Sequence, residues 1–237
     1  AVAVLPLHQV YRAAVRALVA CLGSAPDAGA TAQRYLETAA LVMAAADRPP
    51  RLLITHGLSG SGKSFAALRV VEREGALRLR SDVERKRLAG VGALTDSAAA
   101  GLALYTPDWS ARTYARLESL AAAVLAAGRG AVVDAAFLGR AQRQRFAALA
   151  RAHGVEFGIL DCRADPATLR HRIVTRAATG GDPSEATLAV LERQLASVEP
   201  LDADERRLAI DRPDIDRPDI DRPDIDRPDI DCPDGGR

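Results

Sequence analysis

The stretch GLSGSGKS, residues 57–64, constrains the fold more than any other part of the sequence. It has the spacing of a loop that wraps around phosphate groups, which needs backbone N–H groups that point inward with no side chains in the way. A short apolar run, residues 52–55, precedes the loop, and a helical pattern follows it to about residue 74. Because a phosphate-binding loop connects a strand to a helix, the chain is predicted to bind a nucleoside triphosphate.

The residues of this loop have separate expected roles. The helix after the loop presents its positive dipole end to the phosphates, Lys63 bridges the β- and γ-phosphates, and the Ser64 hydroxyl ligates Mg²⁺. Lys63 and Lys86 are the only lysines among 32 Lys and Arg residues. Because the chain uses Arg almost everywhere for positive charge, the lysine in the loop indicates a specific role for Lys63. The predicted phosphate contacts are Gly57, Ser59, Gly60, Ser61, Gly62, Lys63 and Ser64.

Residues 49–210 alternate between short apolar runs and helical patterns. This alternation predicts an α/β fold in which a parallel sheet is covered by helices on both faces. A capping-box arrangement in Asp182-Pro183-Ser184-Glu185 predicts a helix start there. The expected strands are residues 52–55, 77–80, 131–133, 157–160 and 207–210. The other expected helices run from the loop to about 74, from near Asp82, from Thr106-Pro107 to about 127, over 139–152, and from Asp165-Pro166.

Two segments flank this α/β region. Residues 1–48 contain two amphipathic helical stretches, 7–22 and 30–46, which have no sheet of their own and must pack on something else. Residues 211–230 are four copies of DRPDI, and the proline in every copy forbids a helix interior. With one Ile per copy, residues 211–237 are predicted to be a disordered acidic tail without function, with partner or Ca²⁺ binding as the alternative.

The composition is typical of a soluble globular protein, with 48% hydrophobic and 27% charged residues. No apolar run approaches the ~18–20 residues that span a bilayer, and the N-terminus has no signal-peptide pattern. The chain does not begin with Met, which we interpret as a sign of a fragment or a processed chain. Three scattered cysteines favour a reducing, cytoplasmic location over a disulfide framework or a zinc site.

Two acidic residues follow predicted strands. Asp134 ends the strand AVVD, and an acidic residue at such a position holds Mg²⁺ through water. Asp82 follows the strand before it, where a carboxylate can accept the proton of an attacking hydroxyl. Both residues also suit a helix N-cap, which is the structural alternative. We expect Ser64 and Asp134 to bind the metal and Asp82 to be the catalytic base.

Three arginines, Arg170, Arg172 and Arg176, lie on one predicted helix that leads into a Gly-containing segment, residues 177–182. Arg172 and Arg176 are four residues apart and share a helix face. A mobile segment with arginines can close over a site, exclude water and neutralise phosphate charge. We therefore expect a small lid in which Arg172 and Arg176 are catalytic, with a solvated helix face as the alternative.

Residues 51–210, about two-thirds of the chain, resemble the P-loop kinase module, of the AAA-type P-loop family, of bifunctional aminoglycoside phosphotransferase/ATP-binding proteins. More broadly, the segment is similar to small-molecule and polynucleotide kinases of the nucleoside-monophosphate-kinase type. The resemblance rests on the stretches LLITHGLSGSGKS, LRLRSDVERKRL, YTPDWSARTYARL, VVDAAFLGRAQRQRF and DPSEATLAVLERQLASVEPL.

This resemblance implies a P-loop NTPase fold with a five-stranded parallel sheet and a lid, and ATP and Mg²⁺ as cofactors. It implies that Asp82 is the base, that Arg85 contacts the substrate, and that residues 1–48 are the last helices of an upstream phosphotransferase-like domain. The relatives show DAT or DTN where this chain has Asp134-Ala135-Ala136. The HGD-type catalytic loop of the upstream domain is absent, so aminoglycoside phosphorylation is not assigned to this chain.

Two functions fit these observations. The first is a kinase that transfers phosphate from ATP to a small hydroxylated acceptor. The second is an ATP-binding or ATPase module that regulates an attached domain and has no acceptor of its own. No NKxD motif supports a GTPase and no LSGGQ-like motif supports an ABC ATPase. A nucleic-acid acceptor is disfavoured, because aromatic residues make up only 4% of the chain and no basic stripe is interleaved with them.

Overall fold

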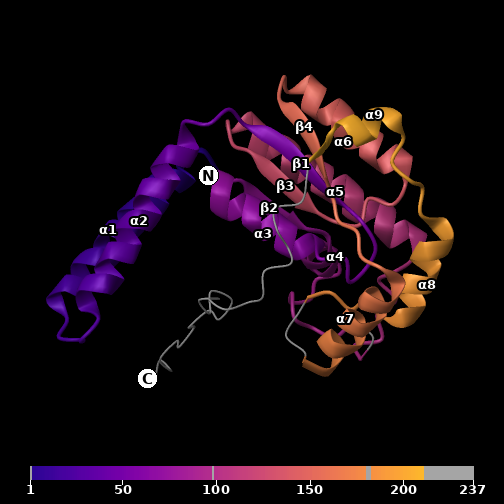
Figure 1. Ribbon diagram of the computed structural model, residues 1–237, viewed down its shortest axis with the longest axis horizontal. Coiled ribbons are helices and arrows are strands. Elements are labelled where there is room, and N and C mark those ends of the chain that lie inside the picture. The colour runs from indigo at the N-terminus through magenta and orange to yellow at the C-terminus, as the bar shows by residue number, and fades with distance from the viewer. Residues whose placement is uncertain (1, 98, 180–182, 211–237) are drawn as a thin grey trace.

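In the computed structural model, which describes residues 2–97, 99–179 and 183–210, five strands form one parallel sheet in the order β2-β3-β1-β4-β5 (Figure 1). Residues 52–56 of the central strand β1 are buried, as expected for a strand that is covered on both faces. This confirms the predicted α/β fold and its five-stranded parallel sheet. The strands are β1 (Arg51–His56), β2 (Leu77–Arg80), β3 (Ala131–Asp134), β4 (Glu156–Asp161) and β5 (Ala209–Ile210).

Helices cover both faces of this sheet, and a helical hairpin precedes it in the chain (Figure 1). The start of α5 confirms the predicted cap, since the Thr106 side chain accepts a hydrogen bond from the Trp109 N–H. A short 3-10 helix, Val2–Val4, is followed by α1 (Leu5–Leu22), α2 (Ala28–Ala46), α3 (Lys63–Glu74), α4 (Ser81–Leu88), α5 (Pro107–Ala126), α6 (Arg140–Ala152), α7 (Pro166–Thr179), α8 (Leu188–Ser197) and α9 (Ala203–Arg207).

Alternate residues of β1 point to opposite faces and divide the core in two. Leu52 and Ile54 pack with apolar residues of α5 and α6, while Leu53 packs with Ala66, Ala67 and other residues of α3. A third, smaller cluster joins α7 to α8. Because all five strands run the same way, their carboxyl ends meet at one edge of the sheet, where the phosphate loop and Asp134 lie.

Two predicted boundaries are wrong. Asp182 of the expected capping box lies outside the described residues, and no helix starts at residues 183–187: α8 begins at Leu188, capped by Thr187. The Glu185 carboxylate pairs with Lys86 of α4 instead. The strand expected at residues 207–210 is only Ala209–Ile210, because a capping box formed by Asp202 and Glu205 starts α9 just before it.

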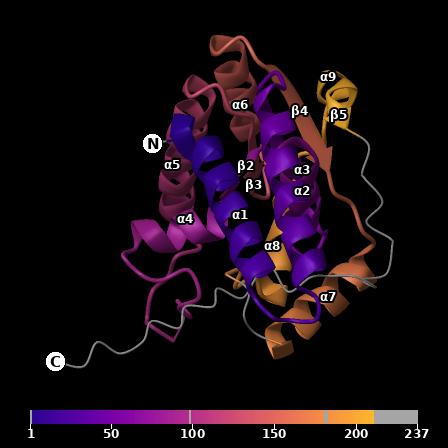
Figure 2. The ribbon, with the colours of Figure 1, turned by 90° about the vertical axis from the view of Figure 1, so that its left-hand side faces the viewer.

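Helices α1 and α2 lie side by side as a hairpin (Figure 2), which projects from the α/β body (Figure 1). Its attachment includes a hydrogen bond from the Arg48 guanidinium to the Arg73 carbonyl and close packing of Ala45 on Gly75. Large apolar side chains of the hairpin remain exposed. These side chains include Leu7, Tyr11, Leu18, Val19, Leu22, Leu36, Leu41 and Met43.

The predicted tail, residues 211–237, lies outside the described residues. Within residues 2–97, 99–179 and 183–210, no helix combines the length and the apolar character needed to cross a bilayer.

Candidate active site

The phosphate loop connects β1 to α3 and depends on glycine. Gly57, Gly60 and Gly62 have φ angles of 143°, 83° and 89°, which side-chain-bearing residues rarely adopt. A Cβ on Gly57 would lie 2.2 Å from the carbonyl oxygen of Cys162 at the end of β4. The first helical residue is Lys63, so the N-terminus of α3 opens toward the centre of the loop.

Two of the predicted phosphate contacts are turned into the protein. The Gly57 N–H donates to the Ala136 carbonyl at 3.1 Å, and the Ser61 N–H donates to the Leu58 carbonyl at 3.2 Å. Neither residue lines the cavity that the loop borders, and Ser61 is 1% exposed. The other five predicted contacts line it: Ser59, Gly60, Gly62, Lys63 and Ser64.

Lys63 is held inside the loop. Its Nζ donates to the Leu58 carbonyl at 2.7 Å. Burial lowers the pKa of Lys63, and the nearby Asp134 carboxylate opposes this effect. A cation that has lost most of its hydration interacts strongly with anionic oxygens, so Lys63 is suited to hold a phosphate.

Ser64 and Asp134 meet as the sequence predicted. The Ser64 hydroxyl donates to Asp134 Oδ2 at 2.9 Å, although the two residues are 70 positions apart. Arg78, from the neighbouring strand β2, donates to the same oxygen through Nη2 at 2.7 Å and Nε at 3.1 Å. A hydroxyl and a carboxylate at this spacing are oxygen donors of the kind Mg²⁺ prefers, so the residues present fit a magnesium ion.

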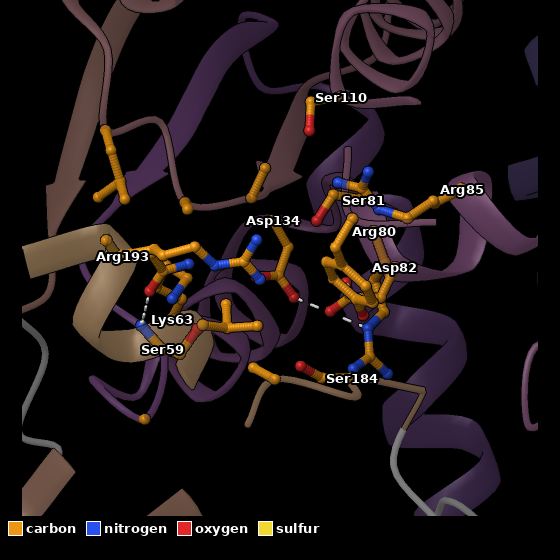
Figure 3. A pocket seen from close by; sticks show the side chains of 18 of the residues that line it. Ser59, Lys63, Arg80, Ser81, Asp82, Arg85, Ser110, Asp134, Ser184 and Arg193 are labelled. Carbon is orange, nitrogen blue, oxygen red and sulfur yellow. Dashed lines mark hydrogen bonds and ion pairs between the residues drawn. The ribbon is translucent and has the colours of Figure 1, made fainter. Parts of the chain in front are cut away.

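Asp82 is the second residue of α4 and faces the same cavity from the other side (Figure 3). The Tyr105 hydroxyl donates to Asp82 Oδ1 at 3.4 Å. Burial raises the pKa of Asp82, and the positive charge of Arg85 partly opposes the rise. A carboxylate with a raised pKa is a stronger proton acceptor than an ordinary aspartate, provided that it is ionised.

Arg85 lies one helical turn after Asp82 and is 7% exposed. Its Nη1 donates to the Leu104 carbonyl at 2.9 Å, and its guanidinium stacks on the Tyr105 ring with 5.0 Å to the centroid. These two contacts hold Arg85 at the cavity wall beside Asp82, where the resemblance places a substrate contact.

Helix α7 brings two of its three arginines to the cavity. Arg172 Nη1 donates to the Gly60 carbonyl of the phosphate loop at 3.3 Å, and Arg176 Nη2 donates to the Ala186 carbonyl at 3.4 Å. Arg170 instead pairs with Glu192 on the exposed side of the helix, 3.0 Å away. Residues 180–182 of the predicted lid lie outside the described residues.

The sequence analysis missed the contribution of α8. The Ser59 N–H donates to Gln194 Oε1 at 2.8 Å, which attaches α8 to the phosphate loop. Arg193 reaches from α8 into the cavity (Figure 3), and its guanidinium has no hydrogen-bond or ion-pair partner among the described residues. The helical spacing of the lining residues in the sequence indicates that they share one face of the helix, although it does not indicate what that face contacts. They are Val190, Arg193, Gln194 and Ser197.

Glu185 anchors the segment between α7 and α8. Its carboxylate lies 2.7 Å from Lys86 Nζ and also accepts hydrogen bonds from the Ser97 N–H and hydroxyl. Its own N–H donates to the Tyr105 hydroxyl at 3.3 Å. Burial raises the pKa of Glu185, but the hydrogen bonds from Lys86 and Ser97 lower it by more, so the pKa lies below its ordinary value. The segment is thereby connected through Tyr105 to Asp82.

The described residues therefore build one cavity of about 610 Å³ at the carboxyl edge of the sheet. Residues 52–201, which include the whole lining of this cavity, match the protein family described as AAA domain. The chain belongs to this family. Two proteins named uncharacterized, from Mycobacterium bovis and Mycobacterium tuberculosis, are 31% identical to it over 193 residues, which cover 78% of this chain and 38% of each relative. The chain thus spans well under half the length of these curated relatives.

Solved structures show the fold to which this AAA domain is similar. An unliganded sugar kinase from Janibacter sp. has a TM-score of 0.51 and 23% identity, covering 68% of this chain and 84% of that one. A gluconokinase from Sinorhizobium meliloti has a TM-score of 0.50 and 21% identity, covering 70% and 84%. At such identities the likeness shows the fold alone, and that fold is the P-loop kinase-like fold.

Proposed function

We infer that the protein is a kinase that transfers the γ-phosphoryl group of ATP to a hydroxyl of a small-molecule acceptor. One observation carries the proposal: the phosphate loop with Lys63 and the carboxylate of Asp82 line the same cavity of about 610 Å³. Phosphoryl transfer needs a site that positions the nucleotide and the acceptor hydroxyl beside each other, with a carboxylate that takes the hydroxyl proton.

Residues that would bind ATP line one side of the cavity. The open N-terminus of α3 and the Lys63 ammonium would bind the β- and γ-phosphates, and Lys63 would exchange its bond to the Leu58 carbonyl for phosphate oxygens. Ser64 directly, and Asp134 through water, would hold Mg²⁺, which neutralises charge on the phosphates when it is bound. Arg78 fixes the orientation of the Asp134 carboxylate.

On the acceptor side, Asp82 would accept the hydroxyl proton. A bond then forms between the acceptor oxygen and the γ-phosphorus while the bond from that phosphorus to the bridging oxygen breaks, and ADP leaves. Arg172 and Arg176, which line the cavity on α7, would neutralise the charge on the transferred group. The Tyr105 hydroxyl would orient the Asp82 carboxylate.

The test is transfer of label from γ-labelled ATP to pools of sugars, hydroxy acids, aminoglycosides and 5′-hydroxyl oligonucleotides. We expect a labelled acceptor with the wild-type protein and none with Asp82→Ala, while ATP still binds to that variant. Lys63→Ala should weaken ATP binding by about tenfold or more, whereas Arg69→Ala, on the exposed side of the same helix, should leave it unchanged.

Label that appears only as free phosphate with every pool would contradict the kinase. It would favour the alternative, an ATPase module that regulates an attached domain. Loss of ATP binding in Asp82→Ala would equally count against the base role, because a base is not needed to bind the nucleotide.

The proposal includes a partner for the α1–α2 hairpin, an upstream phosphotransferase-like domain in the whole protein. The exposed apolar side chains of the hairpin support it, since a surface of this kind is stabilised by packing on another domain. The test is amide hydrogen exchange of residues 5–46 in this chain alone and after addition of such a domain. Slower exchange on addition supports the partner, and unchanged exchange contradicts it.

A further inference from the structure

A serine between α7 and α8 brings a hydroxyl of the chain itself into the cavity. Ser184 lines the cavity together with Lys63 and Asp82, and it lies below Asp82 in the view of Figure 3. The cavity is therefore bordered by the phosphate loop, by the proposed base and by a side-chain hydroxyl of the kind that accepts a phosphoryl group.

The residues beside Ser184 hold it in this place. Pro183, which precedes it, is buried. The carboxylate of Glu185, which follows it, lies 2.7 Å from Lys86 Nζ and accepts a hydrogen bond from the Ser97 N–H at 2.8 Å. Because the backbone is held on both sides of Ser184, its hydroxyl has little freedom left to lose when it reacts.

The Ser184 hydroxyl reaches the carboxylate that is proposed as the base. The Tyr105 hydroxyl accepts a hydrogen bond from the Glu185 N–H at 3.3 Å and donates to Asp82 Oδ1 at 3.4 Å. One side chain thus bridges the backbone next to Ser184 and the carboxylate. Burial raises the pKa of Asp82, and a hydrogen bond from the Ser184 side chain opposes this rise. A general base must lie within hydrogen-bond reach of the hydroxyl whose proton it accepts, and Ser184 meets this condition.

We propose that Ser184 is phosphorylated by the protein's own kinase activity, and that the phosphoryl group is transferred within one chain. The inference rests on the proposed function and adds an internal acceptor to it. The Ser184 oxygen bonds to the γ-phosphorus of ATP while the bond from that phosphorus to the bridging oxygen breaks, Asp82 takes the hydroxyl proton, and ADP leaves. Arg176 donates to the Ala186 carbonyl at 3.4 Å, two residues from Ser184, where its charge can stabilise the transferred group.

The test is incubation of the protein with γ-labelled ATP and Mg²⁺ without any other acceptor, followed by mass spectrometry of its peptides. We expect up to one phosphate per chain, on Ser184. The rate constant of labelling should not change over an about tenfold range of protein concentration, because transfer within one chain is a first-order reaction. Ser184→Ala should lose the label. Ser119→Ala is the matched control, because Ser119 is exposed on α5 outside the cavity lining, and it should be labelled like the wild type.

Binding of a non-hydrolysable ATP analogue shows whether Ser184→Ala is folded. Ser184→Thr keeps a hydroxyl and should retain part of the label, so it replaces the alanine variant if that variant does not bind the analogue. The inference is overturned if the protein stays unlabelled while an acceptor in one of the pools is labelled, a result that leaves the kinase standing. Label on another residue, such as Tyr105 or Ser110, or a rate constant that rises with protein concentration overturns it as well. Absence of label from the protein and from every pool removes both proposals together.

Discussion

The Nζ of Lys86 lies 2.7 Å from a carboxylate oxygen of Glu185, and this pair joins α4 to the segment before α8. The Lys86 side chain is 3% exposed and the Glu185 side chain is 20% exposed. The second lysine of the chain is therefore a structural residue, whereas the first belongs to the phosphate loop. The pair also fixes the N–H that holds the Tyr105 hydroxyl, which in turn contacts Asp82.

Glu185→Gln should destabilise the protein more than Lys86→Met. The glutamine removes the negative charge, so the buried Lys86 ammonium keeps only neutral acceptors such as the Ala93 carbonyl, which we expect to cost about 3 kcal/mol. Lys86→Met leaves a carboxylate that water can still reach, at about 1 kcal/mol. Unfolding in urea, monitored by circular dichroism, measures the loss of stability in both variants. Glu192→Gln is the control, since its exposed pair with Arg170 contributes less than about 1 kcal/mol. Equal urea midpoints for Glu185→Gln and Glu192→Gln would contradict the structural role of the pair between Lys86 and Glu185.

The same pair predicts how stability depends on pH. Hydrogen bonds lower the pKa of Glu185 in the folded protein, below its ordinary value of 4.5. Its contribution to folding is therefore complete above pH 4.5 and is lost as the pH falls through the folded-state pKa. The difference in unfolding free energy between the wild type and Glu185→Gln should shrink on acidification. A difference that grows toward low pH would contradict this sign.

The transfer rate should depend on the ionisation of Asp82. Because burial raises the pKa of Asp82, the rate should decline on acidification at a pH above the ordinary aspartate value of 3.8. Asp82→Asn should lower kcat by about 10²-fold or more and remove this inflection. Asp108→Asn, on α5 and outside the cavity lining, should keep both kcat and the inflection. An unchanged pH profile in Asp82→Asn would exclude Asp82 as the base.

Ser64→Ala should raise the Mg²⁺ concentration needed for half-maximal ATP binding by about tenfold. The hydroxyl that contacts Asp134 is then missing, while Asp134 keeps its bond to Arg78 and the fold is retained. The measurement is ATP titration at a series of Mg²⁺ concentrations. In EDTA the variant and the wild type should bind ATP equally, and a defect of the same size without the metal would argue against a role in metal binding.

Gly57→Ala should be far more damaging than Gly90→Ala, although both glycines have positive φ angles. At Gly57 the new Cβ would lie 2.2 Å from the Cys162 carbonyl oxygen, so the end of β4 must move, at a cost of about 3 kcal/mol or more. At Gly90 nothing lies within 4 Å of the new Cβ, and only the backbone strain of about 1 kcal/mol applies. Thermal unfolding of the two variants measures the difference in stability. Equal unfolding midpoints would show that the end of β4 moves away from the new Cβ at little cost in free energy.

The parts of the fold that were predicted correctly depend on local pattern. Strand β1, the phosphate loop and the start of α5 are each encoded in a few consecutive residues, whose apolar runs, glycines and caps have direct physical consequences. The pairing of Ser64 with Asp134 was predictable for a related reason. Carboxyl ends of parallel strands meet at one edge, so a polar residue that ends β3 must lie near the loop that follows β1.

What was missed depends on contacts between distant segments. Glu185 satisfies the capping-box pattern, yet its carboxylate pairs with Lys86. The full positive charge of an ammonium group attracts a carboxylate more strongly than the partial charge of a helix N–H does. Gln194 and Arg193 reach the cavity only because α8 packs against α7, with Leu191 beside Leu169 and Ile173. No local pattern states which face of α8 will turn toward the phosphate loop until that packing is known.

The order of strands also determines when this protein can acquire its site. Strands β1 and β2 come first in the chain but are not neighbours, since β3 lies between them and pairs with both. A growing chain that ends before residue 131 therefore holds two strands with no sheet to join. The arrival of β3 joins them and brings Asp134 to Ser64 across 70 positions. We therefore expect the pairing of the first three strands and the contact between Ser64 and Asp134 to form together, and loop closure over this distance favours a slow step.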